Sequence, residues 1–91
     1  MINDRKQVIT IHLNKMNIGK NNQSLVLRAM NASEPSKASE KVLNKAYKFA
    51  LLIDSNALNK ERETNMCRIL SKACDEYYRE MQKLIDLGRY W

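Results

Sequence analysis

The stretch that decides the fold is residues 66–85, which read MCRILSKACDEYYREMQKLI. Its apolar side chains recur every three or four residues, the period of an α-helix with a buried face. They are Met66, Cys67, Ile69, Leu70, Ala73, Cys74, Tyr77, Tyr78, Met81, Leu84 and Ile85. Glu61 and Glu63 precede this stretch, where acids complement the helix dipole, and Gly88 is placed to end the helix. The sequence therefore predicts a helix over residues 57–87.

A second helix is predicted over residues 35–53. Ser33 or Glu34 followed by Pro35 is a helix-start signal, because proline fits the first turn of a helix. The segment Asp54-Ser55-Asn56 interrupts the pattern and offers capping side chains for the next helix. At 100° per residue, the apolar arc consists of Val42, Ala46, Phe49, Ala50 and Ile53.

The two predicted helices differ in length, and this difference points to a dimer. A helix over 57–87 spans about 45 Å and one over 35–53 about 28 Å, so the shorter cannot cover the apolar face of the longer. The small N-terminal element could cover part of the remainder, but a second copy of the long helix in a two-fold dimer is the simpler cover. The expected dimer interface comprises Met66, Ile69, Leu70, Ala73, Tyr77, Met81 and Leu84.

The N-terminal third predicts a short β element. Residues 8–13 (VITIHL) are rich in β-branched side chains, with Ile9, Ile11 and Leu13 on one face and Thr10 and His12 on the other. Residues 14–23 (NKMNIGKNNQ) have the composition of a turn-rich loop. Residues 24–30 fit either a second strand that closes a hairpin or a short helix, and we favour the hairpin.

These segments give one domain over residues 1–91. Residues 1–33 are expected to form a basic β and loop element, and residues 34–91 a helical hairpin. The expected fold class is mainly α with a small β part (α+β).

Charge is distributed unevenly along the chain. The net charge is +6, and residues 1–53 carry nine Lys or Arg against three acids, a surplus of six. Residues 54–91 carry seven of each and are balanced. A basic half joined to a neutral half predicts that the basic half meets an anionic partner while the other packs, although positive charge can also serve solubility alone.

Four lysines are predicted to lie on one face of the 35–53 helix. Lys37, Lys41, Lys45 and Lys48 fall in one arc opposite the apolar arc, in a column about 16 Å long. A solvated face usually mixes signs to gain ion pairs between successive turns, and this face does not. Nucleic acid, RNA or DNA, is the expected partner, because phosphate backbones bind such columns. The bland alternative is a plain solvated face.

Other residues are expected to assist the lysines. Arg5, Lys6, Lys15, Lys20 and Arg28 are predicted to add phosphate contacts. Tyr47, beside the column, is predicted to stack on a base. A basic amphipathic helix can also lie on a membrane surface, but here the apolar arc is modest and lacks Trp.

A rival function belongs to another class of protein. The basic face could meet an acidic protein surface, as expected of a small phage- or plasmid-type inhibitor or adaptor that blocks a host protein such as a nucleic-acid-binding enzyme. Tyr90 and Trp91 would then be its anchors, because aromatic side chains dominate interface energetics.

No enzyme is expected, and neither a cofactor nor a metal. The chain has one histidine, His12, read as solvent-facing, and no motif supplies it with a catalytic partner. Cys67 and Cys74 are seven apart on a helix, about 10 Å along its axis, too far for a disulfide, so both are expected to be reduced. With no apolar run long enough for a membrane span or a signal peptide, we expect a cytoplasmic protein.

Overall fold

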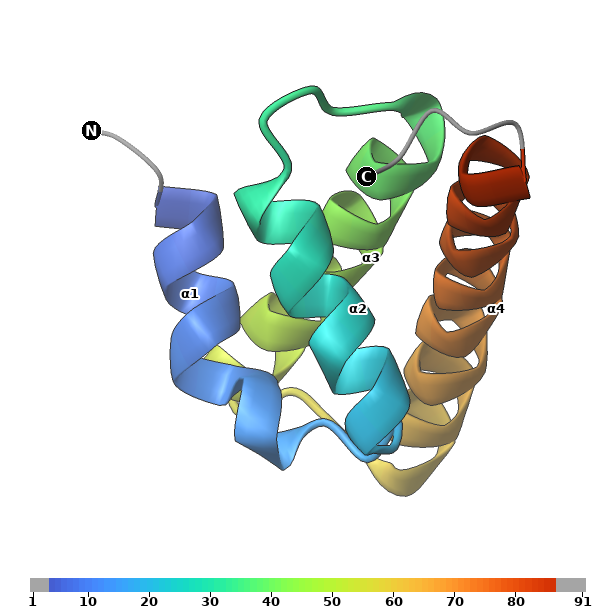
Figure 1. The fold of residues 1–91 in the computed structure, drawn as a ribbon. Helices are drawn as coiled ribbons and strands as arrows, with labels where there is room; N and C mark the ends of the chain where they lie inside the picture. The colour runs from blue at the N-terminus through green and yellow to red at the C-terminus, as the bar shows by residue number, and fades with distance from the viewer. Residues whose placement is uncertain (1–3, 87–91) are drawn as a thin grey trace.

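The structure, a computed structural model, describes residues 4–86, and the regular structure in that range is entirely helical (Figure 1). Four α-helices and one 3-10 turn follow one another along the chain. They are α1 (Asp4–His12), the 3-10 turn (Leu13–Lys15), α2 (Lys20–Asn31), α3 (Lys37–Asp54) and α4 (Lys60–Asp86). The predicted helices over 35–53 and 57–87 are confirmed as α3 and α4, while the α+β class is wrong.

Helix α3 is the central element, because it packs against α1, α2 and α4 (Figure 1). Its buried side chains include Val42, Ala46 and Phe49, which meet Leu70 and Cys74 of α4 in one core. A short connection over residues 55–59 returns the chain, so α3 and α4 are antiparallel. None of the helices within residues 4–86 is long and apolar enough to cross a membrane.

The first turns of α3 and α4 are capped by residues other than those predicted, while Gly88, the predicted cap at the end of α4, lies outside the described residues. Ser36 is the N-cap of α3, where its side chain accepts from the Ser39 N–H in a reciprocal capping box. The Asp54–Asn56 segment ends α3 rather than starting α4, and Asn56 has a left-handed φ of 60°. The Asn59 side chain accepts from the Arg62 N–H at 2.8 Å and caps α4.

The strand predicted over residues 8–13 is wrong, because these residues lie in α1 and the turn after it. The buried side chains are Ile9, His12, Leu13 and Met16, whose spacing of three and four is that of a helix. Ile11, predicted to share a face with Ile9, is 67% exposed. Helical packing against α3 therefore outweighs the strand preference of the β-branched side chains.

The second strand predicted over residues 24–30 is also wrong, because these residues lie in α2, which begins at Lys20 and continues to Asn31. Val26, Ala29 and Met30 are its buried residues, again three and four apart. Part of the segment predicted as a loop, residues 14–23, does connect α1 to α2, and a side-chain amide from the start of α2 stabilises this connection. The Gln23 side chain donates to the carbonyls of Leu13 (3.1 Å) and Met16 (3.2 Å). Gly19, with a φ of 88°, makes the bend into α2.

Helix α2 also changes how α4 is covered. It packs against both α3 and α4, so part of the apolar face that α3 leaves open is covered within the same chain. Among the residues predicted to form a dimer interface, Leu70, Ala73, Tyr77 and Met81 are buried in this single chain. Met66 and Leu84 are half-buried, and Ile69 is exposed.

Candidate functional site

The lysine column (Lys37, Lys41, Lys45 and Lys48) lies on the side of α3 that faces away from the core. Lys37, Lys41 and Lys48 are exposed and Lys45 is half-buried. The interleaved positions Val42, Ala46 and Phe49 are fully buried. Because α3 is a regular helix throughout, all four ammonium groups project from one surface.

Acidic neighbours neutralise only part of the column. Three ion pairs occur among residues 5–85, and one of them involves the column: Lys41 Nζ lies 3.2 Å from Glu76 Oε1 of α4. Both side chains are about half exposed, so the pair contributes little to stability. Lys37, Lys45 and Lys48 have no carboxylate partner among the described side chains.

The contacts between α3 and α4 add a cation that the sequence analysis did not include. Ser36 Oγ donates to Glu80 Oε2 at 2.6 Å, and Lys41 donates to Glu76, which fixes an antiparallel register. One turn further along both helices, the same register places Lys72 opposite Lys45. We call Lys45, Lys48 and Lys72 the basic surface.

The row of residues at 68, 72, 76 and 80 explains why the charge is concentrated at one end. These positions, four apart, share one side of α4, and the row reads Arg, Lys, Glu, Glu. Its acidic half lies beside the first turns of α3, where Glu76 and Glu80 are bonded. Its basic half lies beside the later turns. The separation of bases from acids within this row is visible in the sequence and was the signal that could have found Lys72.

Arg5 is brought to the opposite edge of α3 by α1. Its Nη1 donates to Asn44 Oδ1 at 2.9 Å and lies 3.5 Å from Glu40 Oε1. Lys6, on the same helix, is half-buried. The charge of Arg5 is therefore shared with Glu40 and adds little to the basic surface.

Other predicted contact residues lie elsewhere. Lys15 is exposed on the 3-10 turn, while Lys20 and Arg28 line a groove between α2 and α4. Tyr47 is half-buried and packs against the core, on a side of α3 about 100° from Lys48. Tyr90 and Trp91, the predicted partner anchors, lie outside the described residues.

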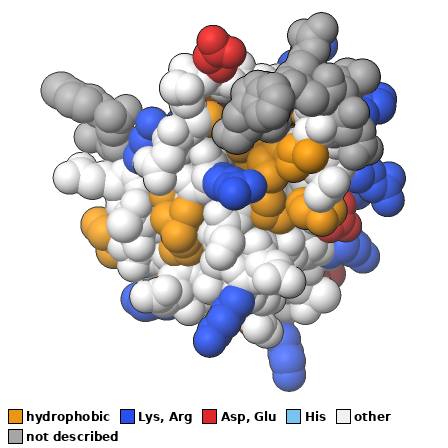
Figure 2. Space-filling view, viewed as in Figure 1, with side chains coloured by type: hydrophobic (Ala, Val, Ile, Leu, Met, Phe, Trp, Pro, Cys, Tyr) orange, Lys and Arg blue, Asp and Glu red, His pale blue; other side chains and the backbone are white. Residues whose placement is uncertain are grey.

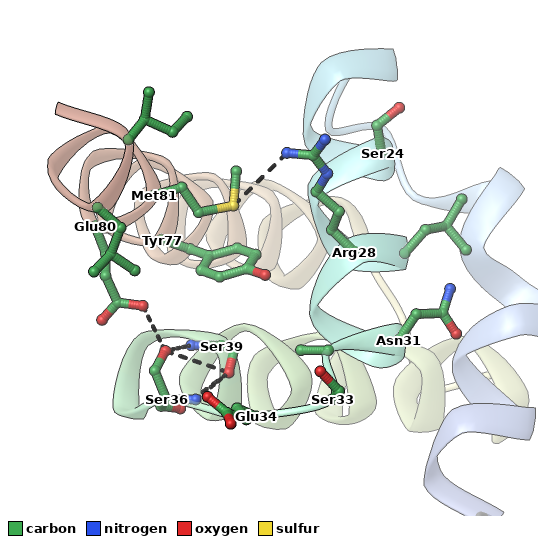
Figure 3. A pocket seen from close by; sticks show the side chains of 14 residues that line it. Ser24, Arg28, Asn31, Ser33, Glu34, Ser36, Ser39, Tyr77, Glu80 and Met81 are labelled. Carbon is green, nitrogen blue, oxygen red and sulfur yellow. Dashed lines mark hydrogen bonds between the residues drawn. The ribbon is translucent and has the colours of Figure 1, made fainter. Parts of the chain in front are cut away.

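A groove between α2 and α4 lies on the face seen in Figure 2, and Figure 3 shows the side chains that line it. Its larger part has a volume of about 1230 Å³. Figure 3 shows Arg28 reaching across from α2 to Met81, with 3.9 Å between the guanidinium nitrogen and the sulfur. On the far wall Ser36 donates to Glu80, next to the capping box of α3.

His12 is buried, which corrects its predicted position on the solvent side of a strand. Its Nε2 lies 3.1 Å from Asp54 Oδ1 and joins the end of α1 to the end of α3. Nδ1 has no hydrogen-bond partner among the described residues. Because the ring is buried and contacts Asp54, we interpret His12 as a residue that stabilises the fold.

Both cysteines are free. Cys74 Sγ donates to the Asn22 carbonyl (3.7 Å), and burial raises the pKa of this thiol to about 11. Burial also raises the pKa of Cys67, opposed by a backbone hydrogen bond from Asn17 and assisted by Glu63. Both thiols are therefore less nucleophilic than an ordinary cysteine at neutral pH.

Within the described part of the chain, no group of three or more His, Cys, Asp or Glu side chains is placed to hold a metal ion. Comparison with protein-family models, curated proteins and solved structures finds no match to this chain.

Proposed function

We propose that this protein is a binding protein that holds the phosphate backbone of a nucleic acid on the basic surface of α3 and α4. The observation that supports the proposal most directly is the absence of carboxylate partners for Lys45 and Lys48 among the described residues. The register of α3 and α4 adds Lys72 opposite Lys45. Like charges held close together repel, and an anion that bridges them relieves that repulsion.

The proposed mode of binding is electrostatic. The lysine side chains extend from rigid helices, so each can reach a phosphate without reorganisation of the backbone. No side chain of the basic surface supplies a bidentate reader of base edges, which favours backbone contacts with low sequence preference. Lys37 and the partly compensated Lys41 would extend the contact along α3. In this proposal the protein works as a homodimer in the cytoplasm.

Charge reversal tests the proposal. Lys45→Glu combined with Lys48→Glu should reduce the affinity for a fluorescent oligonucleotide by about a hundredfold at low salt, because two attractive contacts become repulsive. A matched control, Lys15→Glu combined with Lys60→Glu, makes the same change of charge at exposed residues outside α3. Equal losses in the two variants would show that net charge, rather than the basic surface, determines binding.

A second candidate function is a protein inhibitor or adaptor that docks on an acidic protein surface. It is favoured by exposed Leu51 on α3 and Ile69 on α4, which accompany the basic surface and which a phosphate backbone does not require. Leu51→Ser with Ile69→Ser distinguishes the two functions. Unchanged oligonucleotide affinity in this variant supports the first, whereas an absence of oligonucleotide binding by the unmodified protein favours the second.

A further inference from the structure

The groove between α2 and α4 is continuous along both helices. Two hollows, of about 1230 Å³ and 770 Å³, share Ser24, Arg28 and Met81 at the middle of the groove. One end is formed by Lys20 of α2 and Asp75 of α4. The other end holds further residues of both helices and of the loop before α3, among them Glu34, Glu80 and Ile85.

Large apolar side chains are exposed along this groove. Leu27 is 43% exposed, Tyr78 50% and Ile85 49%. Figure 2 views this face and shows hydrophobic side chains gathered around Lys and Arg side chains. Such a patch, rimmed by charge, is typical of a surface that another protein covers.

We propose that a second copy of this chain docks on the α2–α4 groove in two-fold symmetry. The two helices run in the same direction along the groove (Figure 1), so its ends are chemically different. Lys20 lies with Asp75 at one end, and Glu34 lies with Glu80 at the other. A two-fold axis near Leu27, between these ends, places Lys20 of each copy on Glu34 of the other. The contact between Lys20 and Glu34 is therefore made twice, as a two-fold interface requires.

The middle of the groove fits the same arrangement. Leu27 of one copy meets Leu27 of the other at the axis. Arg28, which contacts Met81 Sδ and has no carboxylate partner among the described residues, comes to lie beside Tyr78 of the second copy. The ring of Tyr78 can accept the guanidinium group in a cation–π contact.

This interface differs from the one that the sequence predicts. The predicted interface is centred on the face of α4 that carries Leu70, Ala73, Tyr77 and Met81, which are buried in the single chain. Docking through the groove uses the neighbouring side of α4, with Tyr78 and Ile85, together with α2.

The dimer has a consequence that rests on the proposed nucleic-acid binding. The lysine column lies on the outer side of α3, and α3 is behind α2 and α4 as seen from the groove (Figure 1). Two copies joined at their grooves point their basic surfaces in opposite directions. Such a dimer holds two nucleic-acid segments apart and bridges them, instead of doubling its contacts with one.

Sedimentation equilibrium tests the docking without any nucleic acid. The unmodified chain should be dimeric at micromolar concentration. Leu27→Glu should weaken the dimer about tenfold or more, because it places two carboxylates at the axis. Ile11→Glu makes the same kind of change at an exposed residue of α1 and should leave the dimer intact. Circular dichroism confirms that each variant is helical.

A charge swap tests the orientation. Lys20→Glu should weaken the dimer, and adding Glu34→Lys to the same chain should restore it. A chain that stays monomeric at all concentrations, with its groove filled by its own residues or free for another protein, overturns the proposal. Failure of the swap to restore the dimer overturns the two-fold arrangement.

Energy transfer between two oligonucleotides, one with a donor and one with an acceptor dye, tests the bridging. The unmodified dimer should bring the dyes together, while Leu27→Glu should bind each oligonucleotide without energy transfer. A dimer that binds no oligonucleotide refutes the proposed function and leaves the docking supported. A dimer that binds oligonucleotides without energy transfer refutes the bridging.

Discussion

The ion pair between Lys41 and Glu76, 3.2 Å long, marks the boundary between two halves of the surface that α3 and α4 share. On one side of it lies the acidic side chain of Glu80, which accepts a hydrogen bond from Ser36. On the other side lie Lys45, Lys48 and Lys72, which have no carboxylate partner among the described residues. Beyond this pair Lys72 of α4 adds a further cation to the lysine column, so the proposed binding surface is centred at that end of the column.

Removing the acid at the boundary should extend the basic surface. We expect Glu76→Gln to raise oligonucleotide affinity severalfold at low salt, since charges a few ångströms apart in water interact by about 1 kcal/mol. The free energy of unfolding should change by less than about 1 kcal/mol, because the pair is exposed. Asp75→Asn, which removes an acid pointing about 100° away on α4, is the control. A larger gain in oligonucleotide affinity for Asp75→Asn than for Glu76→Gln would show that Glu76 does not limit the basic surface.

The helical register of α1 predicts unequal costs for two neighbouring isoleucines. Ile9→Ala should lower the free energy of unfolding by about 2–4 kcal/mol, because a fully buried side chain leaves a cavity. Ile11→Ala should cost little, because Ile11 projects into solvent and alanine favours a helix. Urea denaturation of both variants measures the difference. Similar losses for the two would support a strand over residues 8–13 instead.

The hydrogen bond between His12 and Asp54 should couple α1 to the end of α3. We expect His12→Ala to destabilise the protein by about 1–3 kcal/mol, through lost packing and the loss of this bond. Asp54→Ala should cost less, since its side chain is largely exposed. A double-mutant cycle should give a coupling energy of about 0.5–1 kcal/mol. Additive effects would show that the two residues act independently.

The raised pKa of Cys74 predicts a loss of stability at alkaline pH. In the unfolded chain the thiol ionises around its ordinary pKa of 9.0, while in the folded protein it stays neutral up to about 11. Between these values the unfolded chain binds fewer protons, so the free energy of unfolding falls as the pH rises. Cys74→Ala should reduce the fall between pH 9 and 11, measured by urea denaturation, compared with Cys67→Ala. An identical pH dependence in both variants would contradict the assignment.

The sequence predicts α3 and α4 well because their apolar and polar residues separate clearly at the helical period. The first 33 residues are harder to interpret. Val8, Ile9 and Ile11 favour strands individually, whereas the helical spacing of Ile9, Leu13 and Met16 crosses the predicted boundary between strand and loop. His12, which shares their face, is buried as well. The burial of His12 depends in part on its hydrogen bond to Asp54. This partner lies 42 residues away, so the local sequence does not reveal it.

The candidate site shows the same limit. The lysine column could be placed on one face from spacing alone, since its four members belong to one helix. Lys72 could not, because the contacts between α3 and α4 bring it there. Lys20 and Arg28 were grouped with the column by sign of charge, whereas α2 carries them to the groove on the other side.

The salt dependence of oligonucleotide binding tests the central claim most directly. Fluorescence anisotropy of a labelled single-stranded RNA and of a duplex DNA, each titrated at several salt concentrations, gives the slope of log affinity against log salt. Three phosphate contacts, from Lys45, Lys48 and Lys72 of one basic surface, predict a slope of about −2 to −3, because each phosphate contact releases counterions. A slope near zero, or no binding to either probe at low salt, would contradict the account.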